Sequence, residues 1–290
     1  MAPYALVVDG TATLPVGSAG AADPRRLPQH VVVDGRTYTP GVDLTPAAFY
    51  ALLVGAGGRA TTEPPTLEEC REVLRAALVE GAGRVVVLCV AEELSETLGI
   101  TRRAAEEVGG RIEVIDTRTA ASAIGLMATA LLRERASGGD FGTAVALARR
   151  LAGRIRSLAV VDDHSYLARS ARLSAVASLF GGLHSVRSIL EFREGRPLLL
   201  DTTVGREQAL EHLRQLVSAR LEPGARIHVA VLHTDAPEQA ERLLAWARER
   251  FHCLESWGND AGPLIASHSG PGLVGLSWFR AEDADAAPRG

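Results

Sequence analysis

Short apolar runs rich in valine and isoleucine alternate with longer segments of helical periodicity in the first half of the chain. Because β-branched residues favour strands and a helical pattern follows most runs, this order is typical of a parallel sheet built from β-α-β units. Strands are expected at residues 5–8, 30–33, 85–90, 112–115 and 158–161, and helices at 46–54, 67–79, 97–107, 120–136 and 143–154. Thr45 and Thr66 are expected to cap the first two helices, and Glu69 completes a capping box with Thr66.

The second half of the chain has a different order of elements. Two strand-like runs at 186–193 and 197–203 are joined by Glu194-Gly195-Arg196, which indicates a β-hairpin. The other expected elements are helices at 166–169, 175–180, 207–219 and 237–250, and strands at 227–232, 253–257, 264–267 and 274–279. This pattern predicts a second α/β unit. We expect an N-terminal domain over residues 1–157, a C-terminal domain over 158–280, and a disordered polar tail over 281–290.

The charged residues exclude several classes of chemistry. All 31 basic residues are arginines, so the chain has no lysine. A Schiff-base lysine and the phosphate-binding lysine of a Walker A loop are therefore impossible, which excludes pyridoxal-phosphate catalysis and a standard nucleotide-hydrolysing site. The net charge of −4 gives no general attraction for nucleic acid phosphates or anionic lipid headgroups. We therefore expect no nucleic acid partner.

The cysteines and the apolar runs bear on metals and membranes. Cys70, Cys89 and Cys253 are far apart and lack the spacing of a zinc or redox site, so we expect no metal. Residues 55–60 match G-x-G-x-x-A but follow an expected helix and not a strand, so we expect no cofactor. The chain passes from Met1 to a strand-like run without the features of a signal peptide. No apolar run has the length that spans a bilayer. These patterns predict a cytoplasmic protein without stable membrane insertion.

Ser95 and the pair Thr61 and Thr62 stand where a ligand anion could be bound. Ser95 precedes an expected helix, whose free N–H groups and positive dipole end favour an anion. The alternative is that Ser95 only caps this helix. Thr61 and Thr62 offer hydroxyls on a segment stiffened by Pro64 and Pro65, and the alternative is a simple turn into the next helix.

His268 and Arg172 are candidates for binding the same anion. His268 is expected between two strands, at 264–267 and 274–279, where its imidazole could donate a hydrogen bond or exchange a proton. A structural histidine is the alternative. Arg172 could supply a fixed positive charge, or it could form a surface ion pair of small energetic value. No G-x-S-x-G segment occurs, which weakens the hypothesis that Ser95 and His268 form a serine hydrolase site.

Six short segments, in this order along the chain, resemble those of the DegV family of bacterial fatty-acid-binding proteins. They are D-G-T-A-T-L at 9–14, T-T-E-P at 61–64, L-S-E-T at 94–97, Y-L-x-R-S-A-R-L at 166–173, S-V-R-S-I-L at 185–190 and H-S-G-P-G at 268–272. The resemblance covers nearly the whole chain. It implies an N-terminal three-layer α/β/α domain with a mainly parallel sheet and a C-terminal α/β domain with a mixed sheet.

The resemblance also implies a function and a site. One long-chain fatty acid would lie in a tunnel between the domains, and an ATP-dependent fatty acid kinase partner would phosphorylate its carboxylate. The chain itself would be a lipid-binding protein and not an enzyme. The carboxylate would be bound by Thr61, Thr62, Ser95 and His268, with Arg172, Ser269 and Gly270 in the supporting network. Glu96 stands where the family has glycine, and its carboxylate could repel a ligand anion beside Ser95.

Two other functions remain open from the residues. One is a serine-dependent esterase or acyl-transfer enzyme that uses Ser95 with His268. The other is a sensor of another small carboxylate, which the altered residues near Glu96 would permit.

Overall fold

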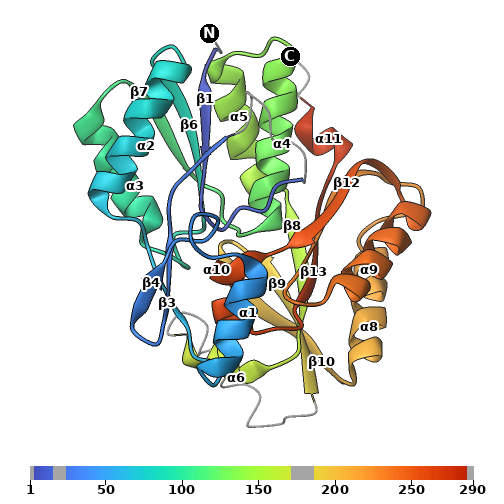
Figure 1. The fold of residues 1–290 in the computed structure, drawn as a ribbon. Coiled ribbons are helices and arrows are strands. Elements are labelled where there is room, and N and C mark those ends of the chain that lie inside the picture. Colours follow the sequence, from blue (N-terminus) through green and yellow to red (C-terminus); the bar gives the residue numbers. More distant parts are fainter. Residues whose placement is uncertain (1–2, 16–23, 171–185, 286–290) are drawn as a thin grey trace.

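The computed structural model describes residues 3–15, 24–170 and 186–285, which form two large sheets with helices on their faces and one small sheet (Figure 1). The first sheet is parallel, with the strand order β2-β1-β6-β7. Its strands are β1 (Ala5–Val8), β2 (Arg25–Arg26), β6 (Arg84–Cys89) and β7 (Arg111–Asp116). β1 is buried along its whole length, as expected for a parallel strand covered on both faces.

Helices cover both faces of this sheet. α2 (Leu67–Glu80) and α3 (Thr97–Val108) pack on the face that includes Val7 and Val87, and α4 (Ser122–Ala136) and α5 (Phe141–Ala152) pack on the face that includes Leu6 and Leu88. Side chains alternate between the two faces because successive strand residues point in opposite directions. The predicted three-layer α/β/α arrangement with a mainly parallel sheet is confirmed.

The second sheet is mixed, with the strand order β10-β9-β8-β13-β11-β12. Its strands are β8 (Arg156–Val161), β9 (Val186–Arg193), β10 (Arg196–Val204), β11 (Arg226–His233), β12 (His252–Asp260) and β13 (Val274–Arg280). β11 and β12 are parallel and the other neighbours are antiparallel. α8 (Arg206–Ser218) and α9 (Pro237–Arg250) cover one face. The predicted hairpin at 186–203 and the mixed sheet are confirmed.

α4 connects the two sheets. Its residues 122–131 are all buried, because one side packs on β1 and β6 and the other on β11 and β13. Figure 1 shows this helix between the parallel sheet and the strands β12 and β13. The helix covers the part of the mixed sheet that includes Trp257 and Phe279, on the face opposite α8 and α9. The rest of that face is left for a cavity.

Two of the strands expected in the parallel sheet lie elsewhere. β3 (His30–Val33) belongs to a small antiparallel sheet with β4 (Arg36–Tyr38) and β5 (Thr61–Glu63). The turn between β3 and β4 is Asp34-Gly35, and both residues have positive φ, which is the geometry of a tight hairpin turn. β8, expected to close the first series of strands, pairs with β9 and β13 in the mixed sheet.

The strand predicted at 264–267 is wrong: these residues lie in the helix α10 (Gly262–Ser269). A short apolar run does not separate a strand from a buried helix by periodicity, and Pro263 at the first helical turn was the available signal. The disordered tail predicted from residue 281 is also corrected, because α11 (Ala281–Ala284) is helical. The Arg150 guanidinium donates to the carbonyls of Asp283 and Ala284 and fixes this helix on α5.

The predicted starts of the first two long helices, at Thr45 and Thr66, are confirmed. α1 (Pro46–Gly55) begins after Thr45, whose side chain accepts from the Ala48 N–H, and α2 begins with the predicted Thr66 and Glu69 capping box. α6 (His164–Arg169) is a short helix before the segment 171–185, so the helix expected at 175–180 lies outside the described residues. Over the described ranges, no helix has the length and apolar character that crossing a bilayer requires.

Candidate functional site

A cavity of about 400 Å³ lies between the mixed sheet, α10, β5 and the loops that follow β6 and β7. This volume is within the usual range for small-molecule sites. The loops after β6 and β7 leave the carboxyl ends of parallel strands, which is where open α/β sheets bind ligands. Of the predicted site residues, Thr61, Thr62, Ser95, His268 and Ser269 line this cavity.

His268 and Thr62 contact each other at the polar end of the cavity. The Nε2 atom of His268, in the last turn of α10, lies 2.9 Å from the Thr62 Oγ1 atom on β5. The Nδ1 atom of the same ring lies 3.2 Å from the Ser170 Oγ atom. Each hydroxyl can rotate to donate or accept, so either tautomer of the imidazole can be accommodated between Thr62 and Ser170.

Ser95 occupies a different part of the same end and belongs to a chain of buried polar groups. Its Oγ atom accepts from the Thr97 N–H at 3.2 Å and lies 2.8 Å from the Thr97 Oγ1 atom. Thr97 Oγ1 accepts from the Gln29 Nε2 group at 2.9 Å. The capping alternative is therefore partly correct, because Ser95 satisfies one N–H at the start of α3. Its hydroxyl still lines the cavity.

Asp9 anchors this chain of polar groups at the end of β1. Its buried carboxylate accepts from the Thr11 N–H and hydroxyl, from the Val90 N–H and from the Gln29 amide. Burial raises the pKa of the Asp9 carboxyl, while these hydrogen bonds favour its ionised form and oppose the rise. Asp9 thus fixes the loops after β1 and β6, and through Gln29 it orients Thr97 beside Ser95.

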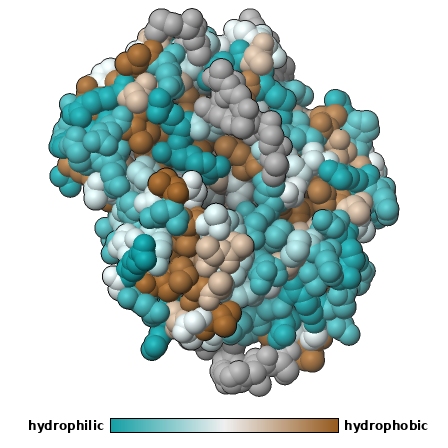
Figure 2. Space-filling view, in the orientation of Figure 1, coloured by the Kyte–Doolittle hydropathy of each residue, from teal (hydrophilic) through white to brown (hydrophobic). Residues whose placement is uncertain are grey.

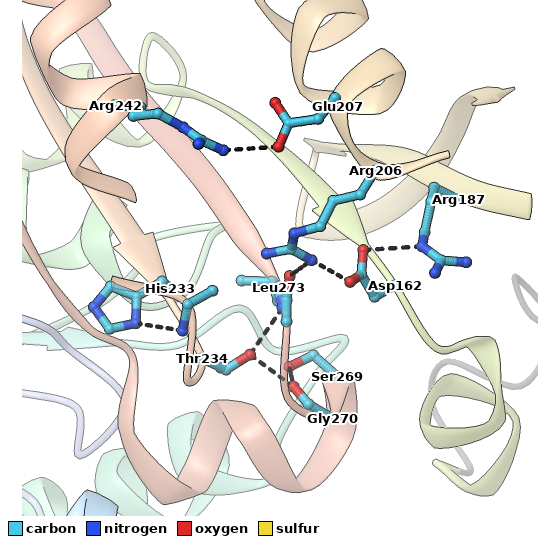
Figure 3. A network of polar contacts seen from close by, with 12 residues as sticks. Asp162, Arg187, Arg206, Glu207, His233, Thr234, Arg242, Ser269, Gly270 and Leu273 are labelled. Atoms are coloured by element: carbon cyan, nitrogen blue, oxygen red, sulfur yellow. Dashed lines mark hydrogen bonds and ion pairs between the residues drawn. The ribbon is translucent and has the colours of Figure 1, made fainter. Parts of the chain in front are cut away.

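The turn after α10 is held by buried hydrogen bonds (Figure 3). The Thr234 hydroxyl donates to the Gly270 carbonyl at 2.7 Å and accepts from the Leu273 N–H at 3.0 Å. Gly270 has a φ of 70°, and a Cβ atom there would lie 2.4 Å from the Tyr166 ring. Gly270 therefore acts through its backbone, and the Ser269 hydroxyl, which donates to the Gly270 and Ile265 carbonyls, supports the same turn.

Arg206 ties this turn to the mixed sheet. Its guanidinium donates to the Gly272 carbonyl and to the Asp162 carboxylate at the end of β8, and Arg187 approaches the other oxygen of Asp162 at 3.1 Å. Figure 3 shows the three side chains meeting beside Leu273. These contacts fix the turn after α10 to the end of β8, and so help to position His268 relative to the mixed sheet.

Arg172 and Glu96 differ from the other residues predicted at or near the site. Arg172 lies outside the described residues, whereas its neighbours Arg169 and Ser170 line the cavity. Glu96 also lines the cavity, but its side chain is exposed to solvent. Water and salt screen an exposed carboxylate, so its repulsion of an anion at Ser95 is weaker than that of a buried charge.

The apolar part of the cavity lies on the free face of the mixed sheet. Cross-strand neighbours Ala159 on β8, Leu190 on β9 and Gly275 on β13 form one row, and the small residues Ala159 and Gly275 leave room above the sheet. Phe192 and Ile265 add apolar walls. The cavity therefore combines an apolar floor with a small group of hydroxyl, amide and imidazole groups at one end.

Hydroxyls occur again two residues further along the strands. The Ser277 Oγ atom lies 2.8 Å from that of Ser157 and 2.9 Å from that of Ser122, at the start of α4. These three serines share hydrogen bonds among themselves, so the floor of the cavity ends against a satisfied polar cluster and not against charge.

The arrangement does not resemble a serine hydrolase site. The hydrogen bonds of the Ser95 hydroxyl are both to Thr97, and the His268 Nε2 atom faces Thr62. A nucleophilic serine needs its base within hydrogen-bond reach. In the part of the chain that the structure describes, no group of three or more histidine, cysteine or carboxylate side chains could hold a metal ion.

Sequence reasoning missed several residues of the site. Gln29, Thr97, Ser170 and Thr234 were not singled out, although Ser170 lies within the Y-L-x-R-S-A-R-L segment. Gln29 and Thr234 carry no local signal, because their partners are distant in sequence and only the folded chain brings them together.

Comparisons with known proteins match nearly the whole chain. The model of the DegV family, described as "Uncharacterised protein, DegV family", matches residues 3–281. A DegV domain-containing protein of Streptomyces coelicolor is 30% identical over 273 residues, which cover 94% of this chain and 96% of the relative. The matched range includes both sheets and the cavity between them.

Solved structures have the same fold. A DegV family protein of Thermus thermophilus, described for its fatty acid binding, is 27% identical with a TM-score of 0.87, and the match covers 95% of this chain and 99% of that one. A fatty acid binding DegV family protein of Streptococcus agalactiae is 27% identical with a TM-score of 0.83, covering 95% and 98% of the two chains.

Proposed function

Because the chain belongs to the DegV family, we propose that it binds one long-chain fatty acid in the cavity described above. The observation that carries this proposal is the apolar floor of the mixed sheet leading to the polar end at Thr62 and His268. The fatty acids bound by the Thermus thermophilus and Streptococcus agalactiae relatives support it. The cavity would lie between two domains, residues 1–157 and 158–280.

The carboxylate of the fatty acid would lie at the polar end. The proposed carboxylate-binding residues are Thr61, Thr62, Ser95 and His268, and the supporting residues are Arg172, Ser269 and Gly270. Hydroxyl and imidazole donors can bind both oxygens of a carboxylate, and the start of α3 adds a favourable dipole. Arg169, which lines the cavity and stacks on Tyr166 at 4.4 Å, places a positive charge at the same end.

Burial of the hydrocarbon tail would dominate the affinity. At about 0.8 kcal/mol for each buried CH₂, about fourteen methylenes correspond to a gross gain of about 11 kcal/mol before the cost of ordering the chain. The polar end therefore needs only to orient the carboxylate. This division explains why a few hydroxyl and imidazole donors beside Arg169 are sufficient for an anionic ligand.

The test is organic extraction of the purified protein followed by mass spectrometry. We expect about one C14–C18 fatty acid per chain, and delipidated protein should bind such an acid again. Thr62→Val keeps the side-chain shape and removes the hydroxyl that faces His268, so it should weaken rebinding. Protein that carries no lipid and takes up no fatty acid would refute the proposal.

We further propose that the bound carboxylate is presented to an ATP-dependent fatty acid kinase partner, which forms an acyl phosphate. The absence of lysine supports a division of labour, because this chain cannot provide a Walker A loop. Loaded protein with ATP alone should give no hydroxamate on trapping with hydroxylamine. Addition of the ATP-binding subunit of a fatty acid kinase should give it, and no product with that subunit would refute the kinase role alone.

A further inference from the structure

A second cavity, of about 580 Å³, lies next to the first, and Phe192 lines both. It is formed by the ends of α5, β9 and β13, the start of β8 and the loop that follows β7. Six arginine side chains line it: Arg118, Arg154, Arg156, Arg193, Arg220 and Arg280. Three carboxylates also line it, so six positive and three negative charges leave a net charge of +3 in a chain whose net charge is −4.

Three of these arginines form ion pairs with two nearby carboxylates. Glu191, whose side chain is only 4% exposed, approaches Arg193 at 2.6 Å and Arg220 at 3.6 Å. Arg280 is held by both oxygens of Glu222 at 2.8 Å. These ion pairs fix the walls of the cavity, and because Arg193 and Arg220 share one carboxylate, one positive charge of this group remains.

The other three arginines lack a close ion-pair partner among the described residues. Within the described ranges, the exposed side chains of Arg118 and Arg156 have no hydrogen-bond or ion-pair partner, and Arg154 reaches Asp283 only at 3.9 Å. Arg118 also has a φ of 55°, in the left-handed region that favours glycine. Like charges gathered without partners repel each other, so an anion in this cavity would be stabilised by all three.

We propose that this second cavity binds a small polyanion that carries two or more phosphate groups. The guanidinium group is planar and offers paired N–H donors that match phosphate oxygens, which suits arginine to this ligand class. A single phosphate is small for a cavity of about 580 Å³ lined by guanidinium groups from separate segments of the chain. The chain has no lysine, so the phosphates would be held by arginines and not by a Walker A loop. This site is independent of the fatty acid proposal.

The test is isothermal titration calorimetry at low ionic strength with pyrophosphate, ADP and orthophosphate. Pyrophosphate should bind more tightly than orthophosphate, and added salt should weaken the binding. Arg156→Gln should weaken pyrophosphate binding about tenfold, as expected for the loss of one charge-assisted contact to phosphate. Equal affinity for ADP and pyrophosphate would show that the cavity recognises only the phosphate groups of the ligand. Tighter binding of ADP would show that the ligand is a nucleotide.

The control removes the same charge elsewhere. Arg103→Gln, on the exposed surface of α3, should bind pyrophosphate like the unchanged protein. Arg156 is exposed on the edge of the cavity, so its replacement should leave the thermal midpoint of unfolding unchanged. Arg118→Gln provides a second variant. The proposal is overturned if pyrophosphate and ADP both fail to bind, or if the Arg156 and Arg118 variants bind as tightly as the Arg103 variant.

Discussion

Replacing Ala159 with leucine is expected to change the length of fatty acid that the protein prefers. Ala159 lies on β8 in the apolar floor of the first cavity, between Leu190 and Gly275 in the neighbouring strands. A Cβ atom at Gly275 would lie only 3.1 Å from the Ala159 Cβ atom. The two positions are thus adjacent, and both line the cavity, so a larger side chain at position 159 takes cavity space whether it points straight up or leans over Gly275.

The size of the effect follows from the carbon atoms exchanged. Leucine has three more side-chain carbons than alanine, so it should displace about three methylenes of a long ligand. At about 0.8 kcal/mol per methylene the loss is about 2.4 kcal/mol, which is roughly a 60-fold weaker dissociation constant for a C18 acid. A shorter acid that ends before this position should lose little.

Displacement of a fluorescent fatty acid by a series of C10–C18 acids measures this change. The matched control is Ala245→Leu, the same substitution on the exposed surface of α9, which should leave the whole series unchanged. The thermal midpoint of both delipidated variants reports whether the fold is kept. An equal loss for short and long acids, or no loss for C18, would show that the tail does not lie on this face of the sheet.

Two further substitutions and one labelling experiment test other parts of the structure. Thr234→Val leaves the buried Gly270 carbonyl and Leu273 N–H without the hydroxyl that they share, so it should lower the free energy of unfolding by about 1–3 kcal/mol, measured in urea. Glu255 lies between His228 and Arg133 of α4; burial raises its pKa, but these partners outweigh burial and lower it. Its contribution to stability is therefore present above its unfolded pKa of about 4.3 and lost as the pH falls through the lower folded pKa, so Glu255→Gln should destabilise at pH 7 and much less in strong acid. A fluorophosphonate probe should leave Ser95 unlabelled, because its hydroxyl is hydrogen-bonded to Thr97 and not to a base. Labelling of Ser95 would instead support the esterase hypothesis.

The apolar outer surface of α1 is another feature that the sequence pattern did not separate from a core helix. The helix has no charged residue, and Val54 near its end is 80% exposed. Figure 2 shows apolar surface gathered over this helix on an otherwise largely hydrophilic face. The pattern of apolar residues therefore did not predict which side of α1 is exposed, whereas Thr45 and Pro46 predicted where the helix begins.

Two of the errors in the predicted fold share one cause. Residues 264–267 and 30–33 are both short apolar runs, but the first lies in a helix and the second is the central strand of a small antiparallel sheet. Period alone does not decide such runs, because four residues can be buried equally well in either conformation. What decided them was the packing of α10 on β3 and β5, which joins segments more than 190 residues apart.

The sequence by itself determined the α/β class, the positions of the capped helices, and the chemistry that a chain without lysine cannot perform. Each of these depends on residues close together in the chain or on composition. Only the tertiary structure decided that His268 meets Thr62, that α4 is shared by both sheets, and that six arginines line one cavity. Such contacts depend on how the buried apolar surface of the whole chain is arranged. A local pattern of residues does not determine that arrangement.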